Sequence, residues 1–269
     1  SLGYDNQWCD FRWTTNFTYS WNKNEIIELA ANAVNPVTGE ALNLTKLDIK
    51  GLGKAKYILK EGGTLGDLYT TSNLRFNDNG YVEVDKNGNL LMTDEGEDIY
   101  LGSVFPNHNL AWRNDFSYKG INLGVLFTAR LGGVCYSATQ ANLDLYGVSE
   151  ASAAARDAGG VLINGREMVD AQKWYQAIGS QSGLPQYYLY SATNVRLQEL
   201  SLGYTFPRKW FRNKLGLTVS FVGRNLWMIY CKAPFDPEAV ASTGLNYQGI
   251  DYFMMPSMRN LGFNVQFQF

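Results

Sequence analysis

The residues able to perform acid-base or nucleophilic chemistry are few and scattered. His108 is the only histidine in the 269 residues, and it stands in the segment SVFPNHNLAW, before an alternating stretch. A Ser-His-Asp or Cys-His catalytic set would need this one side chain, and we prefer to interpret it as a loop residue. Cys9, Cys135 and Cys231 form no CxxC pair and are too few for a disulfide framework. We therefore expect three unpaired thiols and no zinc site.

Carboxylates are the second group whose placement suggests chemistry. Asp236 and Glu238 flank Pro237, and a carboxylate pair at a defined separation is what a glycosidase needs. This hypothesis predicts an activity that is lost when either residue is replaced. A separate acidic run would suit calcium, but its spacing matches no EF-hand, so a solvated loop is the preferred interpretation. The run consists of Asp94, Glu95, Glu97 and Asp98.

Aromatic and basic side chains are the best candidates for contact with a ligand. The aromatic candidates lie in the long segment 131–194 and are Trp174, Tyr175, Tyr187, Tyr188 and Tyr190. Their faces could stack on sugar rings or hold peptide side chains, although packing within the loop or against a partner subunit is preferred. Arg130 and Arg196 could touch a substrate or pair with acidic residues, and pairing is preferred. We expect no cofactor and no enzymatic activity.

Composition excludes several classes of protein. Charged residues make up 18% of the chain and aromatic residues 14%, with 27 glycines and a net charge of −2. Without a basic surplus to neutralise phosphates, a nucleic-acid partner is disfavoured. No apolar run approaches the roughly 18 residues of a membrane helix. The first residues carry no initiator methionine and no secretory leader, so we expect a fragment or a trimmed product.

Alternation of apolar and polar residues is the strongest structural signal. In residues 8–22 the apolar positions are odd, and they include Phe11, Trp13, Phe17, Tyr19 and Trp21. The last stretch, 259–269, repeats the pattern with Leu261, Phe263, Val265, Phe267 and Phe269. Between them, the apolar positions change from even to odd across Lys119-Gly120. A two-residue hairpin turn requires this change, because the residues that flank it point the same way.

The polar faces of these stretches separate two architectures. They carry mainly Asn, Gln, Thr, Ser and Gly, and are almost uncharged after Arg12. A soluble sandwich places Lys and Glu on its wet face more often, whereas a barrel in lipid places small polar residues in its lumen. We therefore predict an all-β fold, an antiparallel transmembrane β-barrel segment. The alternative is a soluble all-β carbohydrate-binding module, which would be a monodisperse monomer without detergent.

The connections between the predicted strands are uneven. Residues 119–120 and 207–216 are short, whereas 131–194 and 228–257 are long. Outer-membrane barrels have this asymmetry, with short periplasmic turns and long outer loops. Two short helices are expected within the first long connection, at 151–158 and 167–178, and a small hairpin is expected separately within 70–98.

Five short motifs follow one another along the chain, and both their sequences and their order are informative. They are LGDLY at 65–69, YKG at 118–120, NVRLQELSLGYTFP at 194–207, GRNLW at 223–227 followed by FDPE at 235–238, and the terminal strand at 259–269. Together they resemble the SusC/RagA family of TonB-linked outer-membrane transporters, and the resemblance covers most of the chain.

The resemblance implies that residues 1–269 are the C-terminal part of a 22-stranded barrel, with the plug domain and the earlier strands absent. It implies a Bacteroidetes-like outer membrane, contact with lipid, and import of oligosaccharides or, less often, peptides. A SusD-like surface lipoprotein would be a partner, and TonB-ExbB-ExbD would act through the missing N-terminal part. The terminal Phe263, Val265, Phe267 and Phe269 resemble the signal read by the outer-membrane insertion machinery.

About seven strands are expected, and two edges would then remain unpaired. They lie near 8–22, 56–69, 110–118, 121–130, 195–206, 215–227 and 258–269. Counting back from a last strand that ends at the periplasm, Asn22 emerges on the periplasmic side. Residues 23–55 would then be an unusually long inner connection.

Overall fold

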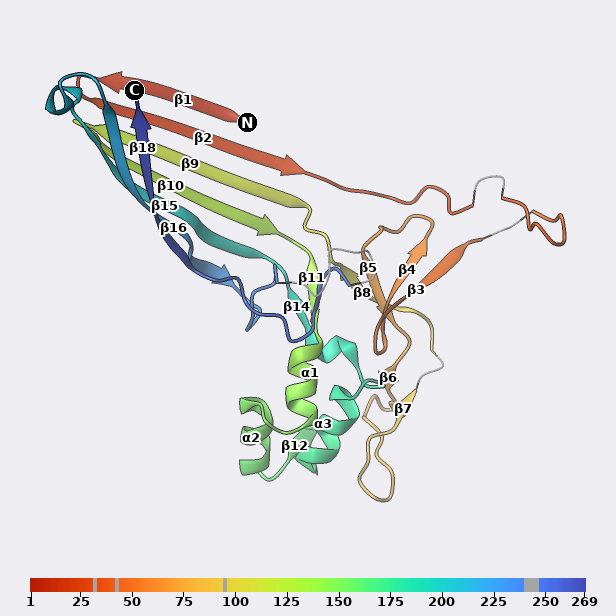
Figure 1. Cartoon of the computed structure of the whole chain (residues 1–269). Coiled ribbons are helices and arrows are strands. Elements are labelled where there is room, and N and C mark those ends of the chain that lie inside the picture. The colour runs from red at the N-terminus through yellow and green to blue at the C-terminus, as the bar shows by residue number, and fades with distance from the viewer. Residues whose placement is uncertain (31–32, 42–43, 94–95, 240–246) are drawn as a thin grey trace.

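The computed structural model describes residues 1–30, 33–41, 44–93, 96–239 and 247–269. These residues form a wide antiparallel sheet and, beyond one end of it, a group of smaller sheets and helices (Figure 1). We call this group the outer region; it comprises the described residues among 22–107, 132–193 and 232–259. None of the helices in the described part of the chain is long and apolar enough to cross a membrane.

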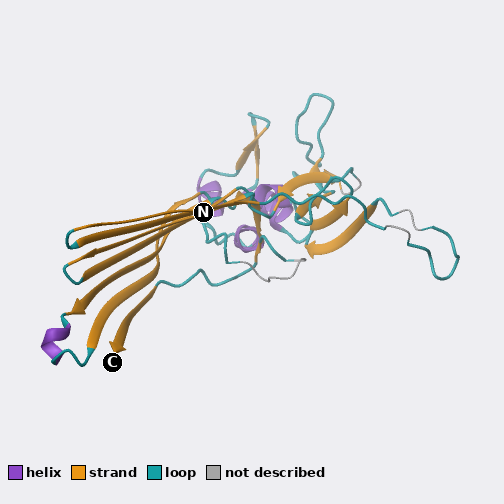
Figure 2. Cartoon of the chain, turned by 90° about the horizontal axis from the view of Figure 1, so that it is seen from above, coloured by secondary structure: helices purple, strands orange, loops and turns teal. Residues whose placement is uncertain are grey.

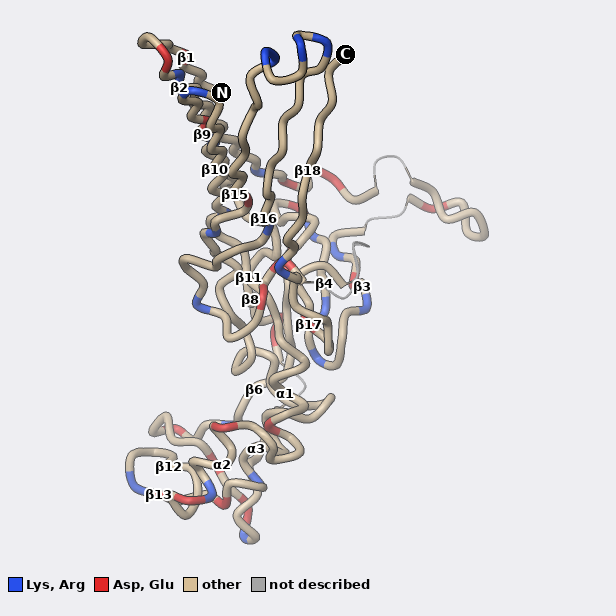
Figure 3. Tube along the Cα trace, turned by 60° about the vertical axis from the view of Figure 1, so that its left-hand side comes forward, with Lys and Arg blue, Asp and Glu red and all other residues tan. Residues whose placement is uncertain are grey.

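The wide sheet has seven strands, and each is antiparallel to its neighbours. In spatial order they are β1 (Leu2–Trp8), β2 (Phe11–Trp21), β9 (His108–Tyr118), β10 (Ile121–Leu131), β15 (Asn194–Phe206), β16 (Gly216–Cys231) and β18 (Asn260–Gln268). In Figure 3, β1 and β2 are seen edge-on while β16 and β18 spread out, so the sheet is curved. The predicted all-β fold with a large antiparallel sheet is confirmed.

The register of the strands separates an apolar face from a polar face. Trp13 pairs with Phe116, and Phe221 pairs with Phe263, so the alternating apolar residues of neighbouring strands stand side by side. Phe17 is 37% exposed and Phe263 80% exposed, and Leu123 is half-buried. Apolar side chains that remain this exposed across a whole sheet face have no second protein layer over them, unlike those of a soluble sandwich.

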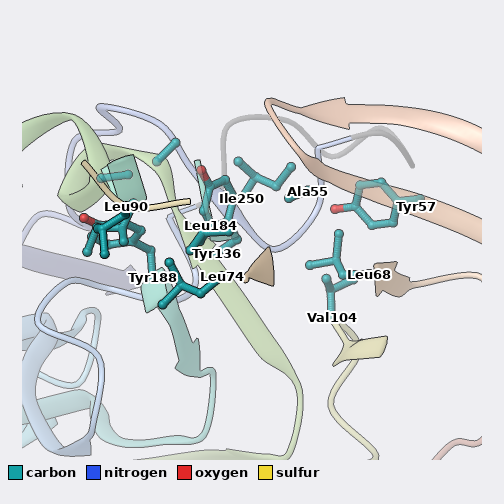
Figure 4. Packing of buried hydrophobic residues seen from close by; sticks show 13 residues of the cluster. Ala55, Tyr57, Leu68, Leu74, Leu90, Val104, Tyr136, Leu184, Tyr188 and Ile250 are labelled. Atoms are coloured by element: carbon teal, nitrogen blue, oxygen red, sulfur yellow. The ribbon is translucent and has the colours of Figure 1, made fainter. Parts of the chain in front are cut away.

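The buried hydrophobic core of the described residues lies in the outer region and not under the wide sheet. Its members include Tyr57, Leu68, Tyr136, Leu184 and Ile250, which come from segments far apart in the sequence (Figure 4). The described residues therefore form a compactly packed part and a single-layered part, the wide sheet, which we call the wall. The apolar face of the wall must find its contacts beyond the described residues.

Small sheets and helices build the outer region. One sheet holds β3 (Lys46–Leu52), β4 (Ala55–Lys60), β5 (Asp67–Thr70) and β8 (Ile99–Ser103), and another holds β14 (Leu189–Ser191), β11 (Val134–Ser137) and β17 (Ile250–Asp251). Two strand pairs are β6 (Asn73–Leu74) with β7 (Met92–Thr93) and β12 (Val161–Ile163) with β13 (Glu167–Val169). The helices, α1 (Ala138–Leu145), α2 (Glu150–Asp157) and α3 (Ala171–Gly179), gather beyond the end of the sheet (Figure 2).

Each of these three helices begins at a side-chain cap. Ser137, Ser149 and Asp170 accept hydrogen bonds from the backbone N–H three residues later, which satisfies one of the free donors at a helix start. The helices expected at 151–158 and 167–178 are confirmed as α2 and α3, although β13 occupies the first residues of the second range. The hairpin expected in 70–98 is also present, with tight turns that end at Gly80 and Gly88.

Short turns join the strands of the sheet at the end away from the outer region. Lys119 and Gly120 have φ values of 46° and 91°, as a type I′ hairpin turn requires. A Cβ atom on Gly120 would lie 2.7 Å from the backbone oxygen of Thr205, so this position has no room for a side chain. The β15–β16 connection at this end contains the 3₁₀ helix η2 (Arg208–Phe211).

One predicted strand was wrong, and one strand was missed. Residues 56–69 are not in the wide sheet but form β4 and β5, where consecutive apolar residues such as Tyr57 and Ile58 are both buried. The strand β1, by contrast, was not predicted. The position expected for Asn22 was also wrong: β2 runs antiparallel to β9, which ends at the 119–120 turn, so Asn22 leaves the sheet at the end of the long loops. The described residues among 23–55 therefore belong to the outer region.

Candidate functional site

Arg196 is the centre of a buried ion-pair cluster where the sheet meets the outer region. It lies near the start of β15 on the polar face, and only 5% of its side chain is exposed. Its Nη2 atom lies 2.8 Å from Asp236 Oδ1 and 3.4 Å from Glu238 Oε1. Arg130 Nε on β10 approaches the same Glu238 oxygen at 3.4 Å. The two strands thus hold both carboxylates of the FDPE motif.

Two further contacts of the 232–259 segment complete this cluster. Ser257 donates a hydrogen bond to Asp236 Oδ2, and the Arg196 Nη1 atom lies 3.4 Å from the same hydroxyl. The Asp236 side chain also accepts a hydrogen bond from the backbone N–H of Glu238 at 3.0 Å. The guanidinium therefore fastens both ends of one long loop to the wall, and we call this group the loop clamp.

A bulge in β16 adds a second fastening beside the loop clamp. Asn225 has a φ of 51°, and the register between β15 and β16 shifts at this point. Its Oδ1 atom accepts a hydrogen bond from Gln198 at 2.9 Å, and its Nδ2 donates to the Met258 carbonyl at 3.3 Å. Asparagine tolerates the left-handed region better than most residues. This explains the asparagine of the GRNLW motif: Asn225 forms the bulge in the strand and hydrogen-bonds to the loop.

Two cavities flank the loop clamp. One, of about 440 Å³, lies between the outer end of β16 and the 232–259 segment, and its walls include Arg196, Trp227, Phe235 and Arg259. The other, of about 320 Å³, includes Arg130, Asn194 and Glu238. Their walls combine apolar surface with a few charged groups, as in sites that bind small polar ligands.

The electrostatics of Asp236 argue against its being the general acid of a glycosidase. Burial alone would raise its pKa, but the hydrogen bonds from Arg196, Ser257 and the Glu238 backbone outweigh it, and the pKa lies below the ordinary 3.8. A general acid needs the opposite shift, because it must hold its proton at the working pH. Asp236 therefore acts as the anionic partner of Arg196, and the carboxylate pair is explained as a fastening.

The five aromatic candidates do not form one surface. Tyr188 lies in the core, and Trp174 and Tyr175 pack against that core from α3. Tyr187 is 44% exposed and meets Trp174 edge-on, with ring centroids 5.8 Å apart. Tyr190 meets Phe235 of the FDPE motif edge-on at 5.5 Å. Packing within the outer region thus accounts for most of their surface.

His108 is the first residue of β9 and not a loop residue as expected. Its Nδ1 atom lies 2.8 Å from the Tyr19 hydroxyl, and the two rings stack. The three cysteines are free, and burial raises the pKa of the Cys135 thiol to about 12, which makes it unreactive. Asp94 and Glu95 lie outside the described residues, and among those described no group of three or more His, Cys, Asp or Glu side chains could hold a metal.

Paired charges cross the polar face of the sheet. Arg113 Nε lies 2.8 Å from Asp115 Oδ2, and Glu199 approaches both Arg113 (3.4 Å) and Arg224 (3.0 Å). On the opposite face, Phe263, Val265 and Phe267 follow one another along β18, with Phe269 beyond its end. The insertion-signal role of these four residues stays a prediction, as does substrate contact by Arg130 and Arg196.

Sequence reasoning missed the partners of the loop clamp rather than its centre. Arg196 and Arg130 were predicted to pair with acidic residues, but Ser257 and Asn225 were not singled out. The available signal was that NVRLQEL, GRNLW and FDPE lie within 45 residues of one another, since strands in sequence order usually pair in a barrel.

No family model matches this chain, but individual known proteins do. The TonB-dependent receptor P3 of Formosa agariphila is 25% identical over 288 residues, covering 96% of this chain and 27% of the receptor. The TonB-dependent receptor P39 of the same organism is 21% identical over 315 residues, covering 96% of this chain and 28% of the receptor. The chain thus spans roughly a quarter of the length of the curated relatives it matches.

Solved structures share the fold. The RagAB peptide importer in its closed-closed state matches with a TM-score of 0.61 and 20% identity, covering 98% of this chain and 28% of the importer chain. In the open-open state the TM-score is 0.59 and the identity 18%, covering 97% and 27%. The relatives are named as receptors and importers rather than enzymes, and the expected outer-membrane localisation agrees with them. The chain is thus similar, over nearly its whole length, to one part of SusC/RagA-like TonB-dependent transporters.

Proposed function

We propose that this chain supplies part of the wall and of the outer loops of an outer-membrane importer. The observation that carries the proposal is the wide sheet, whose apolar face has no protein layer over it in the described residues. Its other face carries paired charges and small polar residues, as the lumen of a barrel does. The outer region then stands on the side of the long loops. No bond is made or broken in this function.

The loop clamp has a defined role in this proposal. Arg196 holds the 232–259 segment against the polar face of the wall, so the segment keeps one position relative to the lumen. A buried ion pair contributes little net stability but fixes geometry, because breaking it leaves an unpaired charge. The clamp therefore determines where the segment stands when a substrate enters.

We infer that the substrates are oligosaccharides or peptides. The family resemblance supports both classes, and the fold is shared with an importer named for peptides. Among the aromatic candidates, Tyr187 offers the most surface, with Trp174 beside it, and an aromatic face serves sugar rings and peptide side chains alike. Arg130, half of whose side chain is exposed, is positioned for a carboxylate in the pore.

The partners follow from the same proposal. A SusD-like surface lipoprotein would cover the outer region, and TonB-ExbB-ExbD would supply energy through parts of the protein that this chain does not contain. Tyr187 and Trp174 are proposed as contacts with either the lipoprotein or the substrate.

Deletion of the gene that carries this chain tests the proposal. We expect the strain to lose uptake of labelled peptides or of labelled oligosaccharides, and the complementing gene to restore it only while the proton gradient is intact. The full gene product should also require detergent to stay monodisperse. Unchanged uptake of both substrate classes, or a stable monomer in plain buffer, would contradict the proposal; the second result would favour the soluble binding module.

A further inference from the structure

We propose that the β15–β16 turn is a binding site for anionic phospholipid headgroups. The turn runs from Pro207 to Leu215 at the end of the sheet that faces away from the outer region. This inference rests on the proposed function, because it needs the apolar face of the wall to lie in a bilayer.

The turn concentrates positive charge without acidic partners. Its basic residues are Arg208, Lys209, Arg212 and Lys214, and residues 207–215 include no Asp or Glu. None of the salt bridges among the described residues involves any of the four. They appear as a blue group beside the C-terminal strands in Figure 3. The excess contrasts with the net charge of −2 of the whole chain.

The neighbouring turns do not neutralise this charge. The β1–β2 turn consists of Cys9 and Asp10, and the β9–β10 turn consists of Lys119 and Gly120. Lys119 Nζ lies 3.9 Å from Asp10 Oδ2, so the acidic residue of these turns already has a partner. The three turns together carry five basic residues and one acidic residue.

Aromatic contacts connect the charged turn with the apolar face. Trp210 is 66% exposed, and its ring centroid lies 5.8 Å from that of Phe206, which meets Tyr204 edge-on at 5.0 Å. Tyr204 pairs with Ile121 and Val219 on the apolar face. Tryptophan is enriched at the level of lipid headgroups, so Trp210 indicates that the turn lies at the membrane interface rather than far out in water.

The position of the turn selects the lipid. Short turns of outer-membrane barrels face the periplasm, where the adjacent leaflet offers phospholipid phosphates. Each Lys or Arg near an anionic surface contributes about 1 kcal/mol, which corresponds to about a fivefold change in affinity. Arg and Lys reach such phosphates with the apolar part of the side chain in the membrane and the charge at its surface.

Lipid binding to the full gene product in detergent, measured by native mass spectrometry, tests the proposal. The two probes are phosphatidylglycerol and phosphatidylcholine with identical acyl chains. We expect phosphatidylglycerol to be preferred, and the double variant Lys209→Gln/Arg212→Gln to reduce the preference about 25-fold. The control is Lys232→Gln, which removes an exposed charge next to the opposite end of β16 and should leave the preference unchanged.

Further outcomes separate this inference from the proposed function. Added salt should weaken the preference, because exposed charges are screened. Equal binding of the two lipids by the wild type, or an unchanged preference in the double variant, overturns the headgroup site and leaves the barrel proposal standing. A protein that inserts into bilayers of neither lipid overturns both. Because the substitutions lie in an exposed turn, heat-modifiable migration in gels verifies that the variant is folded.

Discussion

Removing Arg196 should release the 232–259 segment from the wall. In Arg196→Ala, the Asp236 carboxylate, whose side chain is only 7% exposed, stays near its buried position without its cation. Loss of one partner of a buried ion pair costs about 3–5 kcal/mol. We expect the lower end, about 3 kcal/mol, because Glu238 is 28% exposed and Ser257 still donates a hydrogen bond.

Hydrogen–deuterium exchange of the full gene product in detergent measures this effect. A loss of about 3 kcal/mol corresponds to roughly 100-fold faster exchange of the amides around Asp236 and Ser257. The matched control is Arg224→Ala on the neighbouring strand, which breaks a pair of similar length, 3.0 Å to Glu199, in an exposed setting. Exposed pairs contribute about 0–1 kcal/mol, so the control should change exchange in its surroundings less than about fivefold.

Equal effects of the two substitutions would refute the reasoning. The two variants differ in what they leave behind: Asp236 stays buried without a cation, whereas Glu199 keeps Arg113 as a partner. As a further check, the double variant Arg196→Met/Asp236→Leu should recover part of the lost protection, because neither charge then remains buried alone.

Three further predictions follow from the geometry. Because the pKa of Asp236 is lowered, the loop clamp is fully formed above the ordinary carboxyl pKa and weakens as the pH falls through the lowered value. Amide exchange, corrected for intrinsic pH effects, should therefore be constant between about pH 5 and 8 and should become faster below about pH 4. In the hairpin turn, Lys119→Asn should raise the free energy of unfolding and Gly120→Ala should lower it, each by up to about 1–2 kcal/mol. The melting temperature should change in the same directions, and opposite signs would contradict the turn type. Phe263→Arg should destabilise the protein in bilayers by about 2–4 kcal/mol near the midplane, whereas Asn264→Arg on the other face should cost little, and equal urea midpoints for these two variants would contradict the assignment of faces.

The strands of the wall could be predicted where apolar residues alternate with polar ones. β2, β9, β10, β15, β16 and β18 all follow from alternation and from the hairpin at Lys119-Gly120. β1 was missed because Asn6 interrupts its apolar positions and because its turn begins with Cys9, which has a φ of 53° where a glycine or asparagine would be expected. Such a turn carries no sequence signal.

The outer region was harder to predict because its strands are short and buried on both faces. Residues 56–69 contain enough apolar residues for a strand, but Tyr57 and Ile58 are both buried, which occurs in packed domains and not in a wall that faces lipid. The helix α1, with its sequence ATQANLDL, is too short and too weakly amphipathic to be recognised without its cap at Ser137.

The candidate site was predictable in its charges but not in its assembly. The polar phase of β15 places Arg196 on the polar face of the sheet, and a buried charge there needs an acidic partner. That Asp236 and Ser257 are the partners depends on the path of a long loop, which local sequence does not determine. The hydrogen bonds of the Asn225 side chain depend on the bulge in β16, which the sequence did not predict.

Nitroxide accessibility in the reconstituted full gene product tests the central claim most directly. Spin labels at Leu123 and Phe263 should collide frequently with oxygen, which concentrates in lipid, and rarely with a water-soluble nickel chelate. Labels at the adjacent Asn122 and Asn264 should show the reverse, in step with the alternation of the strands. Low collision rates with both reagents at Leu123 and Phe263 would mean that protein covers this face, and would contradict the account.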